Sequence, residues 1–421
     1  MTQPSEHSPA PTPPPQPQPV RLVEDDPYVV EVDFEAGRRG RSSAVMEVPA
    51  ALPEAEPQAD GVPDHDVVMW AVVFAGGIGS RFWPLSTPER PKPLLSLLGD
   101  RPLIANTVDR LTPLIPPERV LVLTSRDIAD AVHKAIPDVP EANVLVEPRP
   151  LGTAAALAWG AHEVARRAGG RSVCCAIHAD LAVAFPEAFR AVLLDAGAAA
   201  EKHRRIVTVG VRPTRPEPAF GYIRVGAPLD TESGEMRPGG PRACAGFIEK
   251  PAEFLAQELI ETGALWHAGI VAAQAGFLLD SIREHVRELG PGLNALAAGD
   301  LGRFAGMIQS ISIERGLLER SEQVAVVSGE FGWDDVGTWA CLRRARDLDD
   351  YGNGVIGPAH FTDATGNVVH SENGTVVLFG VSQMLVVSLK GITLVTTLDR
   401  ARDLRPLLDT LPGSMRLRPA Q

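Results

Sequence analysis

The chain has 421 residues, enough for two or three domains, and 44% of them are hydrophobic, as is typical of a globular protein. Its net charge of −13 is concentrated in residues 1–68, which carry −9, so the nearly neutral remainder argues against nucleic acid as a partner. No apolar run approaches the length that crosses a bilayer, and no secretory signal is apparent, so we expect no membrane partner. The four cysteines lack zinc-type spacing, which indicates reduced thiols in a cytoplasmic protein.

Residues 1–66 predict a disordered, proline-rich acidic tail. Eight prolines occur in residues 1–20, and acidic residues continue through 21–66 with one possible short strand at 29–34. The alternative is that Met69 is the true start and that the extension is a gene-calling artefact. The intact mass of the native protein distinguishes the two.

From residue 67 onward, apolar runs alternate with helical stretches. Strands are expected at 67–74, 119–124, 143–146, 172–177 and 205–211, and helices at 102–114, 127–135, 153–168 and 185–200. This alternation predicts a parallel, doubly wound α/β sheet, with ligands beyond the carboxyl ends of its strands. We assign residues 67–348 to this domain.

Residues 349–421 change character. Between Gly354 and Val395, short V/I/L runs are separated by Gly, Asn and Ser, which indicates a small β-unit such as a short β-solenoid. A helix around residues 400–411 is expected to close one end of it.

A glycine-rich loop follows the first expected strand. Residues 75–86 read A-G-G-I-G-S-R-F-W-P-L-S, and P-K-P follows at 91–93. Glycines allow backbone amides to approach a phosphate chain, while Arg81 and Lys92 add fixed positive charge. The spacing fits neither a Walker loop nor a dinucleotide fingerprint. The loop therefore predicts a nucleoside-triphosphate cradle; a plain tight turn is the alternative for the glycines alone.

This loop resembles the signature of the sugar-nucleotide pyrophosphorylases, and most closely that of the mannose-1-phosphate guanylyltransferases. Five further segments resemble that family in the same order: E-P-R-P-L-G-T-A-A-A at 147–156, H-A-D-L at 178–181, F-I-E-K-P at 247–251, L-W-H-A-G-I at 265–270 and F-G-W-D-D-V-G-T-W at 331–339. The likeness covers about residues 67–400. It implies a Rossmann-like, GT-A-like mixed sheet with a small C-terminal β-helix-like unit, which often mediates oligomerisation, so we expect a homo-oligomer such as a dimer.

The resemblance implies transfer of a guanylyl group from GTP to mannose 1-phosphate. The sugar phosphate is already anionic, so catalysis reduces to alignment and charge neutralisation. Arg81 and Lys92 would hold the triphosphate, and Asp180 and Asp335 would bind Mg²⁺, which takes few carboxylates beside phosphate oxygens. Asp334 and Asp335 are adjacent, so only one can face the site. The alternatives are a surface lysine for Lys92 and a helix cap for Asp180.

The remaining site residues form two groups. The nucleotide would contact Ala75, Gly76, Gly77, Gly79, Ser80, Arg81, Glu147, Gly152 and Thr153. Thr153 is also expected to cap the helix whose amides face a phosphate or base edge. The sugar phosphate would contact Gly221, Tyr222, Glu249, Lys250 and His267, with a tight turn, a core tyrosine and a surface Glu-Lys pair as alternatives.

Three departures from the family pattern cluster around the sugar. His267 stands where the family usually has Asn. His178 and Leu181 flank Asp180 where the family more often has Ser or Pro, and His. Ala219 precedes Phe220 where the family commonly has glycine. Two alternatives therefore stay open: a related enzyme for another sugar 1-phosphate or nucleotide, and a catalytically weak homologue that binds sugar nucleotides and regulates a partner.

Overall fold

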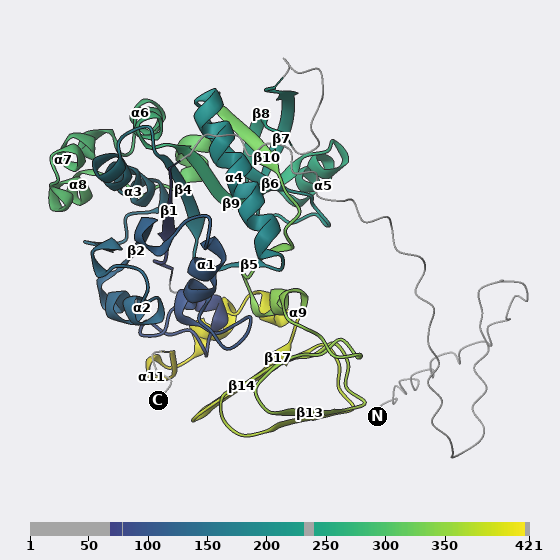
Figure 1. Ribbon diagram of the computed structural model, residues 1–421. Helices are drawn as coiled ribbons and strands as arrows, with labels where there is room; N and C mark the ends of the chain where they lie inside the picture. Colours follow the sequence, from purple (N-terminus) through teal and green to yellow (C-terminus); the bar gives the residue numbers. More distant parts are fainter. Residues whose placement is uncertain (1–67, 78, 231–239, 417–421) are drawn as a thin grey trace, which may run out of the picture. The chain divides into compact units, whose positions relative to one another are not determined.

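The computed structural model describes residues 68–77, 79–230 and 240–416. These residues lie in one compact unit, assigned to residues 64–421 (Figure 1). The predicted tail of residues 1–66, with its possible strand at 29–34, lies outside the described residues. The division into domains at residues 348 and 349 stays a prediction.

A nine-stranded sheet forms the centre of the fold, in the order β3-β2-β1-β4-β9-β6-β10-β8-β7. Its strands are β1 (Met69–Phe74), β2 (Val120–Ser125), β3 (Val144–Glu147), β4 (Val173–His178), β6 (Ile206–Val211), β7 (Gly221–Pro228), β8 (Arg242–Glu249), β9 (Leu265–Gln274) and β10 (Val324–Ser328). Strands β3, β2, β1 and β4 are parallel, as the alternation predicted. However, β9 runs antiparallel between β4 and β6, so the sheet is mixed rather than fully parallel.

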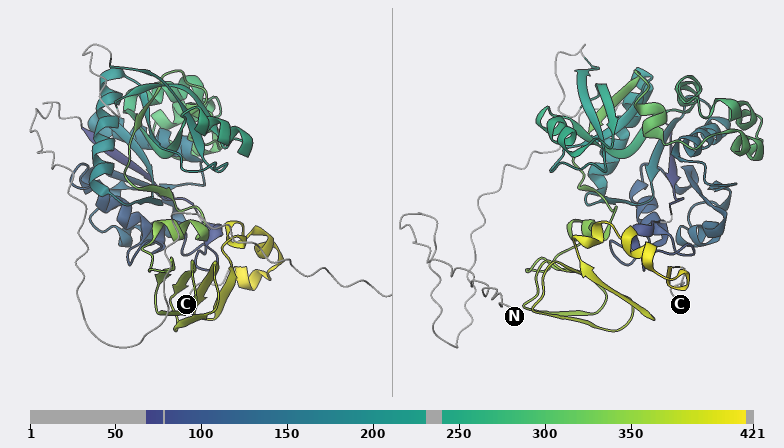
Figure 2. Two further views of the ribbon diagram at one scale, coloured as in Figure 1. Left: turned by 90° about the vertical axis from the view of Figure 1, so that its right-hand side faces the viewer. Right: turned by 180° about the vertical axis from the view of Figure 1, so that it is seen from behind.

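Helices cover both faces of this sheet and produce two apolar cores (Figures 1 and 2). One face carries α1 (Leu103–Leu111), α2 (Ala129–Ala135), α4 (Pro186–His203) and α5 (Glu253–Glu261). The other carries α3 (Thr153–Ala168), α6 (Ala275–His285), α7 (Leu293–Ala297) and α8 (Leu301–Met307). Cys174 and Cys175 are fully buried in opposite cores, because successive side chains of a strand alternate between faces.

A β-helix-like unit follows the short helix α9 (Leu342–Ala345). It contains a four-stranded sheet, β12-β14-β16-β17, and a pair, β13-β15. These strands are β12 (Gly354–Ile356), β13 (Ala359–Thr362), β14 (Val368–Ser371), β15 (Val376–Phe379), β16 (Met384–Leu389) and β17 (Ile392–Thr397). Asn367 joins successive coils, because its amide nitrogen donates to Asn353 and its Oδ1 accepts from the backbone of Met384.

The expected closing helix is interrupted. It consists of a 3₁₀ turn at Arg400–Arg402, α10 (Arg405–Thr410) and α11 (Gly413–Arg416). Ala401 and Leu404 pack in a third apolar core, which contains side chains of both the β-helix-like unit and the glycine-rich segment.

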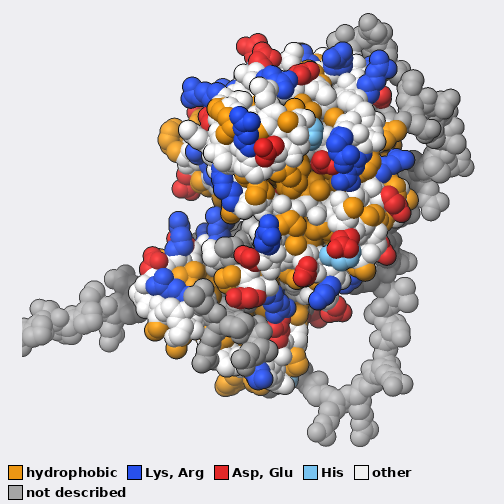
Figure 3. Space-filling view, turned by 90° about the vertical axis from the view of Figure 1, so that its left-hand side faces the viewer, with side chains coloured by type: hydrophobic (Ala, Val, Ile, Leu, Met, Phe, Trp, Pro, Cys, Tyr) orange, Lys and Arg blue, Asp and Glu red, His pale blue; other side chains and the backbone are white. Residues whose placement is uncertain are grey.

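The distribution of surface charge and the character of the helices agree with the composition of the chain. On the face shown in Figure 3, basic and acidic side chains are interspersed, as the nearly neutral charge outside residues 1–68 leads one to expect. Among the described helices, none combines the length and apolar character needed to cross a membrane.

Candidate active site

The glycine-rich segment leaves the carboxyl end of β1, the third strand from one edge of the sheet. Ala75 is buried, and its amide donates to the carbonyl of Leu123 over 2.8 Å. Ala75 therefore continues the sheet, and its amide is occupied; the predicted contact of Ala75 with the nucleotide stays a prediction. The exposed Gly77 has no neighbour within 4 Å of where a Cβ would stand, so open space faces it.

Gly79 allows the segment to pass close to Lys92. Its φ is +71°, and a Cβ there would stand 2.4 Å from the Cβ of Lys92. Only glycine accepts both the left-handed backbone and that approach without displacing its neighbour. We call residues 79–97 the cradle loop, because it begins at this contact and carries both predicted cations.

The two cations differ in their surroundings. Lys92 is buried, and its Nζ donates to Asp180 Oδ2 over 2.5 Å and lies 5.6 Å from the centre of the Phe82 ring. Arg81 is exposed and, within the part of the chain described, forms no hydrogen bond or ion pair. The charge of Arg81 acts on a described carboxylate only at longer range, where, after the hydrogen bonds from Arg405, it helps to lower the pKa of Asp403, so its N–H donors are available to an anion. Lys92, in contrast, is held in place by Asp180.

The two predicted carboxylates are brought together by a short two-stranded sheet. Asp180 lies in the turn before β5 (Leu181–Val183), and β5 pairs antiparallel with β11 (Trp333–Asp335). In that register Asp335 stands opposite Leu181, the residue next to Asp180. Asp334 points elsewhere and accepts two hydrogen bonds from Arg344, at 2.7 and 3.0 Å. Only Asp335 of the adjacent pair lines the pocket, as the alternation of a strand predicts.

The electrostatics of these carboxylates are unequal. Burial alone would raise the pKa of Asp180, but the charges of Lys92 and His178 outweigh it and leave that pKa below its ordinary value. The pKa of Asp335 is raised, mainly by burial, which Lys92 partly offsets and the neighbouring charge of Asp180 reinforces. A pair of carboxylates that resists double ionisation is a fitting site for an added cation.

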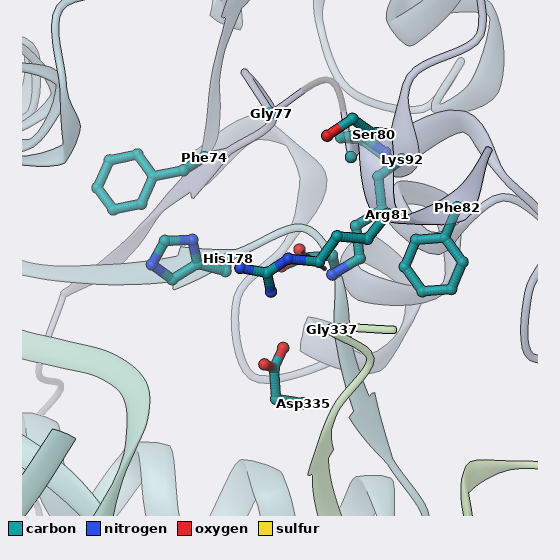
Figure 4. Close-up of a pocket in the computed structure, with 12 residues that line it drawn as sticks. Phe74, Gly77, Ser80, Arg81, Phe82, Lys92, His178, Asp335 and Gly337 are labelled. Carbon is teal, nitrogen blue, oxygen red and sulfur yellow. Dashed lines mark hydrogen bonds and ion pairs between the residues drawn. The ribbon is translucent and has the colours of Figure 1, made fainter. Parts of the chain in front are cut away.

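These residues line a pocket of about 330 Å³ (Figure 4). In Figure 4, the side chains of Arg81, His178 and Asp335 point into the same space. The full lining comprises Phe74, Gly77, Gly79, Ser80, Arg81, Phe82, Lys92, Pro93, His178, Asp180, Asp335 and Gly337. All four predicted catalytic residues and three further predicted nucleotide contacts, Gly77, Gly79 and Ser80, thus meet in one pocket.

Glu147 ends β3, and Gly76 lies beside it. A Cβ on Gly76 would stand 3.5 Å from Glu147 Oε2. Burial raises the pKa of Glu147 to about 7, although a hydrogen bond from the backbone of Leu151 opposes the rise. With such a pKa, a hydrogen-bond donor placed against the Glu147 carboxyl would shift it toward its charged form near neutral pH.

The expected role of Thr153 as a helix cap is wrong. Gly152 occupies the cap position of α3 with φ +87°, and no side chain caps the helix. The Thr153 hydroxyl instead accepts a hydrogen bond from the amide of Ile313, and the amide of Ala154 donates to Ile311. A neighbouring segment thus uses groups that we expected to face the nucleotide. Sequence spacing does not report this contact, because the partners are some 160 positions apart.

The predicted sugar contacts lie on β7, β8 and β9, outside the lining of the pocket. Glu249 and Lys250 pair with each other at the end of β8, and Lys250 has φ +53°. A Cβ on Gly221 would stand 2.9 Å from Glu249 Oε2. Tyr222 is fully buried in a core, and its hydroxyl accepts the amide of Glu217, so the structure agrees with a core tyrosine.

His267 belongs to a buried polar cluster that the sequence did not reveal. Its Nδ1 lies 2.7 Å from the hydroxyl of Thr208, and its Nε2 lies 3.7 Å from Glu314 Oε1. Burial opposes ionisation of Glu314, but His267 and then His178 lower its pKa to about 2. Glu314 begins a π-helix, Glu314–Leu318, and no motif in the sequence points to it.

Five residues of the pocket lining are missing from the predicted site: Phe74, Phe82, Pro93, His178 and Gly337. His178 ends β4 and meets Phe74 edge-on at 5.4 Å. The sequence distinguishes His178 only as a departure from the family pattern near Asp180. A Cβ on Gly337 would stand 2.8 Å from Asp335 Oδ2, so glycine permits the turn that presents this carboxylate.

The chain belongs to the nucleotidyl transferase family, whose model matches residues 70–350. A second model, described as a MannoseP isomerase/GMP-like beta-helix domain, matches residues 361–411. Together these matches confirm the predicted mixed α/β nucleotidyltransferase fold with a C-terminal β-helix-like unit.

Relatives with assigned names extend this result. Mannose-1-phosphate guanylyltransferase of Escherichia coli K12 is 28% identical over 83% of this chain and 74% of its own length. Alginate biosynthesis protein AlgA of Pseudomonas putida is 27% identical over 82% of this chain and 72% of its own length. Among solved structures, a Thermus thermophilus protein named mannose-1-phosphate geranyltransferase has 36% identity and a TM-score of 0.73, covering 81% of this chain and 98% of its own.

Proposed function

We propose that the protein is a mannose-1-phosphate guanylyltransferase, which makes GDP-mannose and pyrophosphate from GTP and mannose 1-phosphate. The observation that carries the proposal is the pocket in which Arg81, Lys92, Asp180 and Asp335 meet the glycine loop. The names of the relatives support the choice of base and sugar.

The reaction needs alignment more than proton transfer. A sugar phosphate oxygen attacks the α-phosphorus of GTP, a new P–O bond forms, and the bond to the β-phosphate oxygen breaks to release pyrophosphate. Arg81, which forms no hydrogen bond or ion pair with the other described residues, would bind the β- and γ-phosphates. Lys92, fixed by Asp180, would neutralise the charge that develops on the leaving group.

Glu147 is the residue we propose to recognise the base. Guanine presents two adjacent N–H donors on one edge, and a carboxylate accepts both, whereas uracil and thymine offer one. Glu147 stands beside Gly76, where a base can approach without meeting a side chain. Donors from guanine would favour the charged form of a carboxyl whose pKa burial raises to about 7.

The carboxylates of Asp180 and Asp335 fit Mg²⁺. Asp335 lies on β11 and Asp180 directly precedes the paired strand β5, and the raised pKa of Asp335 indicates that a second negative charge there is costly without a cation. When bound, Mg²⁺ would supply charge neutralisation at the phosphate oxygens. Lys92 contacts Asp180 and would keep that carboxylate oriented.

A second candidate function is transfer to another sugar 1-phosphate. The buried Thr208–His267–Glu314 cluster favours it, because this cluster lies where the family pattern places a sugar contact. A weakly catalytic, regulatory homologue is a third; the presence of all four predicted catalytic residues in one pocket argues against it.

The test is a pyrophosphate-release screen that crosses four nucleoside triphosphates with several sugar 1-phosphates. Turnover restricted to GTP and mannose 1-phosphate is expected. Turnover with another pair would refute the base or the sugar assignment, and tight GDP-mannose binding without turnover would select the regulatory alternative. The predicted dimer and the cytoplasmic location are separate proposals; light scattering and cell fractionation measure them.

A further inference from the structure

The cradle loop packs against the C-terminal β-helix-like unit. The third apolar core contains Phe82, Trp83, Leu85, Leu95 and Leu97 of the loop together with Val368, Leu385 and Val387 of that unit. None of these loop side chains is more than 7% exposed. The loop that carries Arg81 and Lys92 thus rests on strands more than 270 residues further along the chain.

Trp339 lies at the centre of this contact and is fully buried. Its indole N–H donates to the carbonyl of Trp83 over 3.2 Å, and its ring meets Phe82 at 5.3 Å and His370 of β14 at 5.8 Å. Phe82 in turn lines the pocket and lies below the Lys92 ammonium. The rings of His370, Trp339 and Phe82 therefore form a continuous set of contacts between the β-helix-like unit and the Lys92 ammonium.

A charged contact holds the loop beside Lys92. Arg90 donates two hydrogen bonds to Glu372, which follows β14, at 3.0 and 2.8 Å. The backbone of Arg90 is also fixed, because its N–H and C=O both bond to the backbone of Thr87. Only Pro91 separates Arg90 from Lys92, and proline restricts φ, so a displacement of Arg90 is transmitted to Lys92.

The other end of the loop is held by the same unit. The buried Arg346 donates to the carbonyl of Leu97 over 2.9 Å and to that of Val369 over 3.2 Å, and it lies 3.3 Å from His370 Nδ1. His370 Nε2 lies 3.4 Å from Glu372 Oε1. One connected set of polar contacts thus joins Arg90 and Leu97 of the cradle loop to β14 and the residue that follows it.

We infer that the β-helix-like unit positions the phosphate-binding cations of the pocket, and that Glu372 is a positioning residue that acts on Lys92 through Arg90. The inference rests on the proposed function only in taking Lys92 as a ligand of the triphosphate. The positioning itself is a property of the free protein and can be measured without a nucleotide.

The first measurement is amide hydrogen exchange of the free, full-length protein and of Glu372→Gln. We expect amides of residues 85–97 to exchange at least about threefold faster in the variant, because loss of the ion pair weakens the hold on the loop. The matched control is Glu288→Gln. Glu288 also binds an arginine through two hydrogen bonds, at 2.8 and 2.9 Å, and Arg320 is 30% exposed against 32% for Arg90.

The second measurement is steady-state kinetics. We expect Glu372→Gln to raise KM for GTP by about 3- to 30-fold, the range for residues coupled to a site through a network, while KM for the sugar phosphate changes less than about twofold. Arg90→Gln should have the same effect, and the double variant should be no worse than either single one, because both remove one interaction.

The outcomes separate the two proposals. Unchanged exchange and unchanged KM in Glu372→Gln, or effects no larger than those of Glu288→Gln, would overturn the inference. Additive effects in the double variant would also overturn it. Faster exchange in a protein whose wild type turns over no nucleotide would support the positioning role and refute the proposed function.

Discussion

Replacement of Asp335 by asparagine separates a role in the reaction from a role in folding. Asp335 lines the pocket, and within the described chain its carboxylate accepts no side-chain hydrogen bond. Its pKa is raised in the folded protein, so stability contributed by the protonated form is lost as pH rises through the folded pKa. At neutral pH its charge therefore opposes folding, and Asp335→Asn should be as stable as the wild type or more so.

The same change should greatly reduce turnover. Loss of one preorganised electrostatic contact costs about 10²- to 10³-fold in rate, or roughly 2.7–4 kcal/mol. The assay is pyrophosphate release with saturating GTP, mannose 1-phosphate and Mg²⁺, together with thermal unfolding of the same sample. We expect at least a ~10²-fold lower kcat and an unchanged or higher Tm.

Asp334→Asn is the matched control. Asp334 is the preceding residue, but its carboxylate binds Arg344 outside the pocket lining. A partly exposed pair of this kind contributes about 0–1 kcal/mol, so this variant should lose some stability and keep its turnover within about threefold. Turnover near wild type in Asp335→Asn, or equal losses in the two variants, would refute the assignment of Asp335.

Three further predictions concern the nucleotide. Gly79→Ala should cost about 1–2 kcal/mol of stability from its left-handed backbone and raise KM for GTP at least ~10-fold by displacing Lys92. Gly77→Ala meets open space in the protein without ligand, so thermal unfolding should show little loss of stability. Because the pKa of Glu147 is raised to about 7, KM for GTP should fall as pH rises through that value, and the stability contributed by protonated Glu147 should be lost as pH rises through it. In Glu147→Gln, kinetics and thermal unfolding measured across this pH range should show neither dependence. Chelation by EDTA should abolish turnover, and added Mg²⁺ should restore it; activity in EDTA would exclude the metal.

Local patterns predicted much of the fold. The apolar runs that became β1, β2 and β4, and the alanine-rich α3, carry their structure in short-range periodicity, so their positions agree with the structure within a few residues. The position of β9 could not be predicted in this way. Its insertion between β4 and β6 is decided by long-range pairing, which spacing along the chain does not report.

The same limit applies to the site. Arg81, Lys92, Asp180 and Asp335 belong to motifs at loop and strand ends, and parallel topology gathers such ends at one edge of the sheet. Glu314 belongs to no motif and reaches His267 only because the π-helix packs against α3, α6 and β8. No local pattern indicates that Glu372 meets Arg90 across 282 positions either.

The third apolar core has a consequence for any attempt to dissect the protein. The nucleotidyl transferase match ends at residue 350, and the beta-helix match begins at residue 361, which invites expression of the two halves alone. Truncation at that boundary would expose to water the apolar side chains that now pack against the β-helix-like unit, among them Phe82, Trp83, Leu95, Leu97 and Trp339. The isolated N-terminal fragment is therefore expected to aggregate and to fold poorly around the cradle loop.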